Sequence, residues 1–248
     1  ALYYNFNESE NESDGRVYIY YGSSSGPGNT PSVIIESPVT GTNACFGKYV
    51  ILNDFNNDGY DDIAVAAKNF YSNSGKVYIY YGSASGPGTT PDTVITQTSQ
   101  YFPSSICSGD FNNDGYADLA MGNTNERKVY ILNGGTAKIA DCNLDSDTPD
   151  ATCFVTGENP GSFLTAGDFD GDNDYDLAAA DENDPKVYIF QGSTSGVSES
   201  ATSINIGTNL ISSLTTGDIN NDGYDDLVAG SSSYSSSKGI VYVYHGSD

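Results

Sequence analysis

One Asp-rich segment of nine residues occurs four times along the chain. The first copy reads Asp-Phe-Asn-Asn-Asp-Gly-Tyr-Asp-Asp, and the copies occupy residues 54–62, 110–118, 168–176 and 218–226. Their starts are 56, 58 and 50 residues apart. Self-similarity at a period of about 20 to 50 residues or slightly more is the signature of repeat architectures. The chain is therefore expected to fold as a series of similar modules.

A second repeated segment resembles Val-Tyr-Ile-Tyr and is followed by Gly. It occurs five times, at residues 17–22, 77–82, 129–134, 187–192 and 241–246. These segments are apolar on both alternating faces and rich in Val, Ile, Tyr and Phe, which predicts strands that pack between neighbouring sheets. Helical spacing is absent, and clusters of Gly, Ser, Asn and Pro separate the predicted strands.

Each module is predicted to contain four strands. One precedes the Asp-rich loop, the Val-Tyr strand is the third, and a weaker fourth lies near residues 94–98. The second strand follows the loop, at residues 63–67, 119–122, 177–180 and 227–230. Four strands in roughly 50 to 60 residues make one propeller blade, so we expect an all-β propeller of four-stranded antiparallel blades. A β-solenoid or sandwich is the alternative, but solenoid coils are shorter and sandwiches do not repeat one loop.

These segments resemble the FG-GAP repeats of integrin α-subunits and of many secreted microbial proteins. Phe46-Gly47 stands eight residues before Asp54, and Ala66-Ala67 stands where Gly-Ala-Pro would follow in that family. The later copies depart from the Phe-Gly pair, with Phe102-Pro103, Pro160-Gly161 and Leu210-Ile211. The resemblance covers nearly the whole chain, and it implies a calcium-binding β-propeller.

The two ends depart from the repeat. A single domain over residues 1–248 is expected, with modules at about 1–44, 45–100, 101–158, 159–208 and 209–248. The first module lacks its opening strand and the last lacks its fourth, which leaves three complete blades, whereas related propellers usually resemble seven-bladed rings. The end parts could form one closing blade, the chain could be a fragment, or open edges could pair with another chain. Residues 1–6, which are Tyr-rich, are expected to add to an edge in cis or in trans.

The Asp-rich loops are predicted to bind calcium. Ca²⁺ prefers six to eight oxygen ligands, and a tightly turned loop can supply side chains from positions 1, 3, 5 and 9 and a carbonyl from position 7. For each loop the predicted ligands are given in chain order, and the fourth residue, at position 7, contributes its backbone carbonyl. They are Asp54, Asn56, Asp58, Tyr60 and Asp62; Asp110, Asn112, Asp114, Tyr116 and Asp118; Asp168, Asp170, Asp172, Asp174 and Asp176; and Asp218, Asn220, Asp222, Tyr224 and Asp226.

Position 6 of each loop is predicted to adopt a left-handed conformation. Gly59, Gly115 and Gly223 occupy it in three loops, and Asn173, the residue type that best tolerates this conformation after Gly, occupies it in the third. An EF-hand would need Glu at position 12, where this chain has Val65, Met121, Ala179 and Ala229. Mg²⁺ requires a stricter octahedron, and softer metals prefer the His and Cys that the loops lack, so about four Ca²⁺ ions are expected. If the loops were metal-free Asx turns, 13 clustered carboxylates would be left unpaired.

A further acidic segment at residues 141–150 alternates oxygen-bearing side chains. Asp141, Asn143, Asp145, Asp147 and Asp150 could hold a fifth ion, but a solvated acidic loop is the favoured interpretation.

The chain carries a net charge of −24 and has a pI near 4.1. This charge repels phosphate backbones and anionic membranes, which excludes nucleic acid as a partner. The sequence contains no run of eighteen apolar residues, which is the length that would predict a membrane span. The chain begins at Ala1 without an initiator Met, which is typical of a mature or trimmed protein, and we expect an extracellular, secreted or cell-surface location.

The cysteines and two sequons fit an oxidising compartment. Cys142 and Cys153 enclose ten residues, and a disulfide between them is predicted. Cys45 and Cys107 lie at different points of their repeats, and their pairing is left open. Asn7 and Asn11 begin Asn-Glu-Ser sequons and are possible glycosylation sites.

No catalytic arrangement stands out. The single histidine, His245, ends the last Val-Tyr strand, no nucleophile elbow or phosphate loop occurs, and the clustered carboxylates are assigned to metal. The protein is therefore predicted not to be an enzyme. We expect an adhesive or structural protein that engages protein partners or assembles with itself through blade edges. The alternative is a glycan-binding lectin that calcium stabilises, in which some of the twenty tyrosines stack on sugars.

Overall fold

The computed structural model describes residues 14–39, 44–68, 75–99, 101–155, 158–232 and 238–247. Every regular element in this part of the chain is a β-strand, and no helix is long and apolar enough to cross a membrane. The sequons at Asn7 and Asn11 and the predicted edge strand at residues 1–6 lie outside the described residues.

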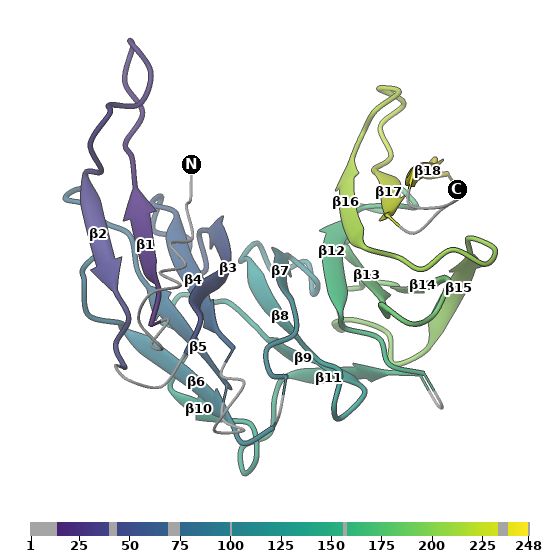
Figure 1. Ribbon diagram of the computed structural model, residues 1–248, viewed down its shortest axis with the longest axis horizontal. Coiled ribbons are helices and arrows are strands. Elements are labelled where there is room, and N and C mark those ends of the chain that lie inside the picture. Colours follow the sequence, from purple (N-terminus) through teal and green to yellow (C-terminus); the bar gives the residue numbers. More distant parts are fainter. Residues whose placement is uncertain are drawn as a thin grey trace. The chain divides into compact units, whose positions relative to one another are not determined.

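The described strands form five sheets (Figure 1). The first sheet contains β1 (Arg16–Ile19) and β2 (Val33–Glu36). The second has the order β10-β6-β5-β4-β3, with β3 (Phe46–Asn53), β4 (Asp62–Ala67), β5 (Gly75–Tyr80), β6 (Thr93–Gln97) and β10 (Cys142–Asn143). The third has the order β11-β9-β8-β7, with β7 (Ile106–Gly109), β8 (Asp118–Asn123), β9 (Lys128–Leu132) and β11 (Ala151–Phe154).

The last two sheets continue the same pattern. The fourth runs β12-β13-β14-β15, with β12 (Phe163–Gly167), β13 (Asp176–Ala180), β14 (Lys186–Phe190) and β15 (Ala201–Asn205). The fifth runs β16-β17-β18, with β16 (Ser213–Gly217), β17 (Asp226–Ser231) and β18 (Ile240–Tyr244). Within these two sheets all neighbouring strands are antiparallel.

The strand order confirms the predicted blade. In each complete sheet the chain runs from the strand before the Asp-rich loop to the strand after it, then to the Val-Tyr strand, then to a fourth strand. The first sheet holds only the Val-Tyr strand and its fourth strand, and the fifth sheet holds only the first three strands. The expectation of partial first and last blades is therefore confirmed for the described residues.

The chain divides into two compact units. The first contains Ala1–Asp54, Gly59–Pro103 and Ala140–Asp147, and the second contains Phe55–Asp58, Ser104–Ile139 and Thr148–Asp248. The predicted single domain with five modules stays a prediction.

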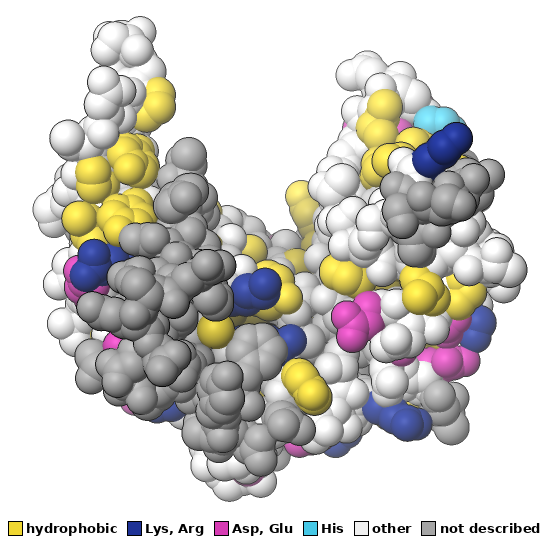
Figure 2. Space-filling view, in the orientation of Figure 1, with side chains coloured by type: hydrophobic (Ala, Val, Ile, Leu, Met, Phe, Trp, Pro, Cys, Tyr) yellow, Lys and Arg dark blue, Asp and Glu magenta, His cyan; other side chains and the backbone are white. Residues whose placement is uncertain are grey.

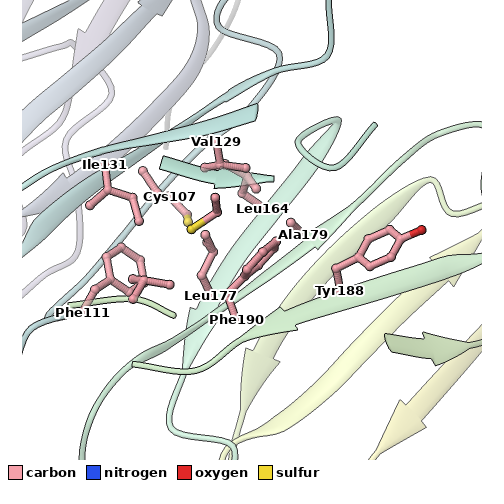
Figure 3. Close-up of a cluster of buried hydrophobic side chains, with 12 residues drawn as sticks. Cys107, Phe111, Val129, Ile131, Leu164, Leu177, Ala179, Tyr188 and Phe190 are labelled. Atoms are coloured by element: carbon pink, nitrogen blue, oxygen red, sulfur yellow. The ribbon is translucent and has the colours of Figure 1, made fainter. Parts of the chain in front are cut away.

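The second strand of each complete blade is buried on both faces. All residues of β4, β8 and β13 are buried, and these strands use small residues, as in the Ala-Ala-Ala of residues 178–180. Small side chains suit a strand whose two faces both meet neighbouring sheets, because close approach leaves little room. In the second unit, Phe111, Leu177 and Phe190 belong to one such cluster between sheets (Figure 3).

The acidic segment at residues 141–150 is mostly exposed, as the favoured interpretation of a solvated loop predicts, but two of its residues form the short extra strand β10. β10 pairs in parallel with β6, with Cys142 opposite Ile95. The Asp141 carboxylate accepts a hydrogen bond from the Val94 N–H at 2.7 Å, and the Asp145 carboxylate accepts one from the Thr98 N–H at 2.9 Å. These carboxylates therefore satisfy backbone donors at the edge of the sheet, and a fifth ion there stays an unsupported prediction.

The predicted disulfide between Cys142 and Cys153 is wrong in this structure, where all four cysteines are free thiols. Cys142 lies in β10, which pairs with β6, whereas Cys153 lies in β11, which pairs with β9. Their closeness in sequence misled the prediction, because the short segment between them changes sheet. Cys153 is instead buried in the cluster that contains Cys107.

Candidate metal sites in the Asp-rich loops

The four Asp-rich loops occupy the same place in their sheets. Each connects the first strand of a blade to the second, from β3 to β4, β7 to β8, β12 to β13 and β16 to β17. Because each hairpin connection turns within a few residues, alternate side chains of the loop point inward toward its own backbone. The hydrogen bonds inside each loop report this arrangement.

The Asp at position 1 closes each loop by accepting the N–H of position 6. The N···O distances are 2.8 Å from Gly59 to Asp54, 2.8 Å from Gly115 to Asp110, 3.0 Å from Asn173 to Asp168, and 3.1 Å from Gly223 to Asp218. The side-chain oxygen at position 3 accepts the N–H of position 5, for example from Asp114 to Asn112 at 3.0 Å and from Asp222 to Asn220 at 3.0 Å. The three alternating side chains at positions 1, 3 and 5 are thus held by backbone N–H groups of the turn itself.

Two positions of each loop adopt left-handed backbone conformations. The prediction for position 6 is confirmed, with φ of 88°, 87°, 69° and 96° at Gly59, Gly115, Asn173 and Gly223. Position 4 was missed, although it also has positive φ, at Asn57, Asn113, Gly171 and Asn221. The signal was present in the sequence, since Asn and Gly are the residues that adopt this conformation most readily.

The third loop brings three carboxylates together. Ligand oxygens of Asp168, Asp170 and Asp172 all lie within 4.8 Å of one another. Two oxygens that bind one Ca²⁺ at about 2.3 to 2.6 Å can be at most about 5 Å apart, so this spacing fits a single ion. Burial, and then the negative charge of Asp172, raise the pKa of Asp170 because both disfavour its ionised form. A bound divalent cation would offset this unfavourable energy.

In the other three loops the side chain at position 3 is an amide. Asn56 donates to the Asp58 carboxylate at 3.0 Å, and Asn220 donates to the Asp222 carboxylate at 2.7 Å. An amide oxygen is also a calcium ligand, but it brings no charge. Among the described residues, therefore, the third loop alone gathers three acidic ligand atoms so closely.

The Asp at position 9 is part of the blade core. Asp62, Asp118, Asp176 and Asp226 are at most 1% exposed. One oxygen of each accepts the N–H of the Gly after the Val-Tyr strand, from Gly82 at 2.8 Å, Gly134 at 2.9 Å, Gly192 at 2.9 Å and Gly246 at 3.1 Å. In three loops the other oxygen accepts the N–H of position 2, from Phe111, Phe169 and Ile219. Asp176 is not one of the three clustered carboxylates, so its role as a ligand stays a prediction.

Burial acts on these position-9 carboxylates. It raises the pKa of Asp118 to about 7 and that of Asp176 to about 6, against the lowering effect of the backbone N–H donors. The residue whose N–H donates to Asp118 must also be small, because a Cβ at Gly134 would lie 2.2 Å from the Ala117 carbonyl oxygen. The repeated Gly is visible in the sequence, but its role as a donor to the position-9 Asp is seen only in the contact between the loop and the third strand.

Neighbouring loops of the second unit are hydrogen-bonded to one another. The Tyr175 N–H donates to the Asp110 carbonyl at 3.2 Å, and the Asp225 N–H donates to the Asp168 carbonyl at 2.8 Å. The Asp225 carboxylate returns a bond by accepting the Asp168 N–H at 3.1 Å. Hydrogen bonds therefore link the loops of consecutive blades within the second unit.

This arrangement of loops and strands agrees with what comparison with known proteins finds. A family model described as FG-GAP-like repeat matches residues 54–121 and 168–229, which together make just over half of the chain. The chain belongs to the FG-GAP-like repeat family. Both matched segments begin at the first Asp of one loop and end in the strand that follows the next loop along the chain, β8 for the first segment and β17 for the second.

The FG-GAP relatives include integrin α-subunits. Integrin alpha-6 of Homo sapiens is 36% identical over 121 residues, covering 48% of this chain and 10% of the relative. Integrin alpha-PS3 of Drosophila melanogaster is 33% identical over 132 residues, covering 49% of this chain and 11% of the relative. The matched part of this chain thus spans about a tenth of these relatives.

The chain is also similar to a solved structure, "Structure of Dos1 propeller", with a TM-score of 0.52 at 12% identity. The match covers 94% of this FG-GAP chain and 51% of the chain in that structure. At that identity the likeness bears on the fold alone. It confirms the predicted β-propeller.

Tyrosine occupies position 7 in three of the FG-GAP loops. Tyr60 is 44% exposed, whereas Tyr116 and Tyr224 are partly buried. The N–H groups of Tyr116 and Tyr224 donate to the carboxylates at position 5, and Asp174 does the same in the third loop. The predicted use of the position-7 carbonyls as ligands stays a prediction.

The single histidine lies beside the fourth loop. His245 Nδ1 is 3.0 Å from an oxygen of Asp226 and 3.3 Å from the Asn220 amide nitrogen. It is the cyan side chain of Figure 2. In this position it adds a side-chain group to the Asp226 carboxylate, which also accepts the N–H groups of Ile219 and Gly246.

Proposed function

We propose that this protein is a calcium-stabilised, non-catalytic β-propeller that acts outside the cell in adhesion or structural assembly. The observation that carries the proposal is the cluster of Asp168, Asp170 and Asp172, whose ligand oxygens have the mutual spacing that one divalent ion requires. The remaining loops repeat its turn geometry with Asn at position 3, which supports about four ions bound in equivalent places.

Calcium is the ion favoured by the donor set. The loops offer carboxylate, amide and carbonyl oxygens, without the thiolate or imidazole that softer metals prefer. Positions 1, 3 and 5 would hold the ion directly, while position 9 joins the loop to the third strand of the blade. The ion would neutralise carboxylates that otherwise repel one another and would thereby stabilise the loop.

Adhesion or assembly follows from family membership and from the surface. The relatives are integrin α-subunits, and both incomplete sheets present strands that could pair with another polypeptide. Protein partners or further copies of the chain are therefore proposed as ligands. Glycan binding stays an alternative, and no contact among the described residues favours it.

Calorimetric titration of the calcium-free protein with CaCl₂ tests the metal sites. We expect about four sites in the parent chain and the loss of one in Asp172→Asn, which removes charge from the third loop. Glu199→Gln is the matched control, because Glu199 is exposed and lies outside the loops. Unchanged stoichiometry and affinity in Asp172→Asn, or the absence of calcium binding to the parent chain, would contradict the proposal.

A further inference from the structure

Gln191 reaches into the third Asp-rich loop from the third strand of the same blade. It directly follows β14, and its side-chain amide donates to the Asp170 carboxylate at 2.8 Å. Asp170 is one of the three carboxylates whose ligand oxygens lie within 4.8 Å of one another. A residue outside the loop therefore contacts a predicted calcium ligand.

Asp170 is the carboxylate of this cluster that the loop backbone holds least firmly. Asp168 accepts two backbone N–H groups of the loop at 2.7 and 3.0 Å, and Asp172 accepts one at 2.9 Å. Asp170 accepts the Asp172 N–H at 3.4 Å, which is longer than the usual N–H···O range of about 2.7 to 3.2 Å. The bond from Gln191 is shorter than this backbone bond, so it supplements the weakest contact in the cluster.

An Asn at position 3 supplies a donor that Asp170 lacks. Asn56 and Asn220 donate an amide N–H to the Asp at position 5, at 3.0 and 2.7 Å, and their oxygens accept the position-5 backbone N–H at 3.1 and 3.0 Å. An ionised carboxylate cannot donate, and its charge repels the carboxylate at position 5 instead. The third loop thus has an additional charged ligand but lacks this bond, and Gln191 provides an N–H donor to the same residue.

Backbone contacts fix Gln191 beside the loop. The N–H of the next residue, Gly192, donates to Asp176 at 2.9 Å, and a Cβ at Gly192 would lie 2.3 Å from the Tyr175 carbonyl oxygen. The Gln191 carbonyl accepts the Ser198 N–H at 2.7 Å. Because the backbone is already held, the amide reaches the loop by ordering one side chain.

The fourth blade repeats this contact with another residue type. His245 precedes Gly246 as Gln191 precedes Gly192, and His245 Nδ1 lies 3.3 Å from the amide nitrogen of Asn220 at position 3. The residue before this glycine therefore meets position 3 of its own loop in two blades.

We infer that Gln191 is a positioning residue for the calcium ion proposed in the third loop, where its amide holds the Asp170 carboxylate at the spacing that one ion requires. The inference rests on the calcium site proposed above and adds a residue that lies outside the repeated loop motif. A carboxylate offers about four lone-pair positions, so Asp170 can accept the Gln191 amide and still bind an ion. Removing a group that hydrogen-bonds to a metal ligand typically costs about 10- to 100-fold in metal affinity.

Calorimetric titration of the full calcium-free chain with CaCl₂ tests this role. Gln191→Met keeps the length of the side chain but removes the donor, and it should weaken calcium binding at one site by about 10- to 100-fold. Gln191→His supplies an imidazole N–H at the same position and should restore most of the affinity. Because Gln191 is exposed, both variants should unfold in excess EGTA at the same temperature as the parent chain, whereas a purely structural role would lower that temperature.

A double-mutant cycle assigns the effect to the third loop. In a chain that already carries Asp172→Asn, Gln191→Met should leave the remaining calcium binding unchanged. Unchanged affinity in Gln191→Met, equal losses in Gln191→Met and Gln191→His, or the same loss in both backgrounds would overturn the inference. If Asp172→Asn loses a site and Gln191→Met does not weaken it, the calcium site stands and the role of Gln191 fails, whereas a parent chain that binds no calcium contradicts both.

Discussion

The buried Asp at position 9 has a different task from the other acidic residues of its loop. Asp176 accepts N–H groups of Phe169 and Gly192, and both donors would lose this partner if its side chain were removed. Asp172, in contrast, lies in the exposed part of the loop. The two residues should therefore respond differently to calcium.

We expect Asp176→Ala to lower the free energy of unfolding by about 2 to 4 kcal/mol with or without calcium, since two buried donors lose an acceptor. Asp172→Ala should lower it only when calcium is present. Urea unfolding followed by circular dichroism, in EGTA and in CaCl₂, measures both. A calcium-dependent effect of Asp176→Ala that vanishes in EGTA would assign that residue to the metal alone.

The free thiols also differ in their surroundings. Burial raises the pKa of Cys153 to about 12 and raises that of Cys107 as well, so the reactive thiolate of each is scarce near neutral pH. Cys142 is only partly buried, in the short strand β10.

Iodoacetamide at about pH 8 should therefore label Cys142 before Cys107 and Cys153 in the native protein, and all four cysteines after unfolding. Peptide mass spectrometry gives the order. Recovery of Cys142 and Cys153 as a disulfide-linked peptide would contradict the free thiols of this structure.

At the scale of single elements, the loops should depend on calcium for their stability. If each site binds at roughly 10⁻⁴ M and calcium is about 1 mM, mass action contributes about 1.4 kcal/mol per site. Four sites would then raise the melting temperature by on the order of 10 °C or more.

Differential scanning calorimetry in excess EGTA, with MgCl₂ as the comparison ion, should show this loss and only partial recovery with magnesium. A melting temperature that EGTA does not change would remove the structural role of calcium.

The added strand β10 makes a second prediction at this scale. Asp145→Ala removes the acceptor of the Thr98 N–H, so hydrogen exchange at Thr98 should accelerate while exchange in the centre of β5 stays slow. Ser146→Ala is the neighbouring control. Unchanged exchange at Thr98 would mean that the parallel pairing of β10 alone protects this edge.

At the scale of the whole molecule, the incomplete first and last sheets bear on assembly. Open strand edges recruit partners, and the strong negative charge opposes indiscriminate association. Electron microscopy and light scattering in calcium should reveal oligomers or filaments that raised salt favours. A monodisperse monomer at high concentration would exclude self-assembly and leave other protein partners as the proposal.

The sequence by itself determined the blade and the loops. The Asp-rich segments and Val-Tyr strands recur in register, and local rules for Gly and Asn conformations sufficed to predict the turn at Gly59 or Asn173. Such features depend on a few neighbouring residues and on strand periodicity, so they are legible without any contact between distant parts.

Only the tertiary structure decided where neighbouring segments meet. It placed Cys142 and Cys153 in different sheets, turned Asp145 toward the edge of β6, and joined Asp176 to Gly192. These outcomes depend on packing between strands far apart in sequence, because burial and hydrogen-bond satisfaction are settled by the whole fold and not by local pattern.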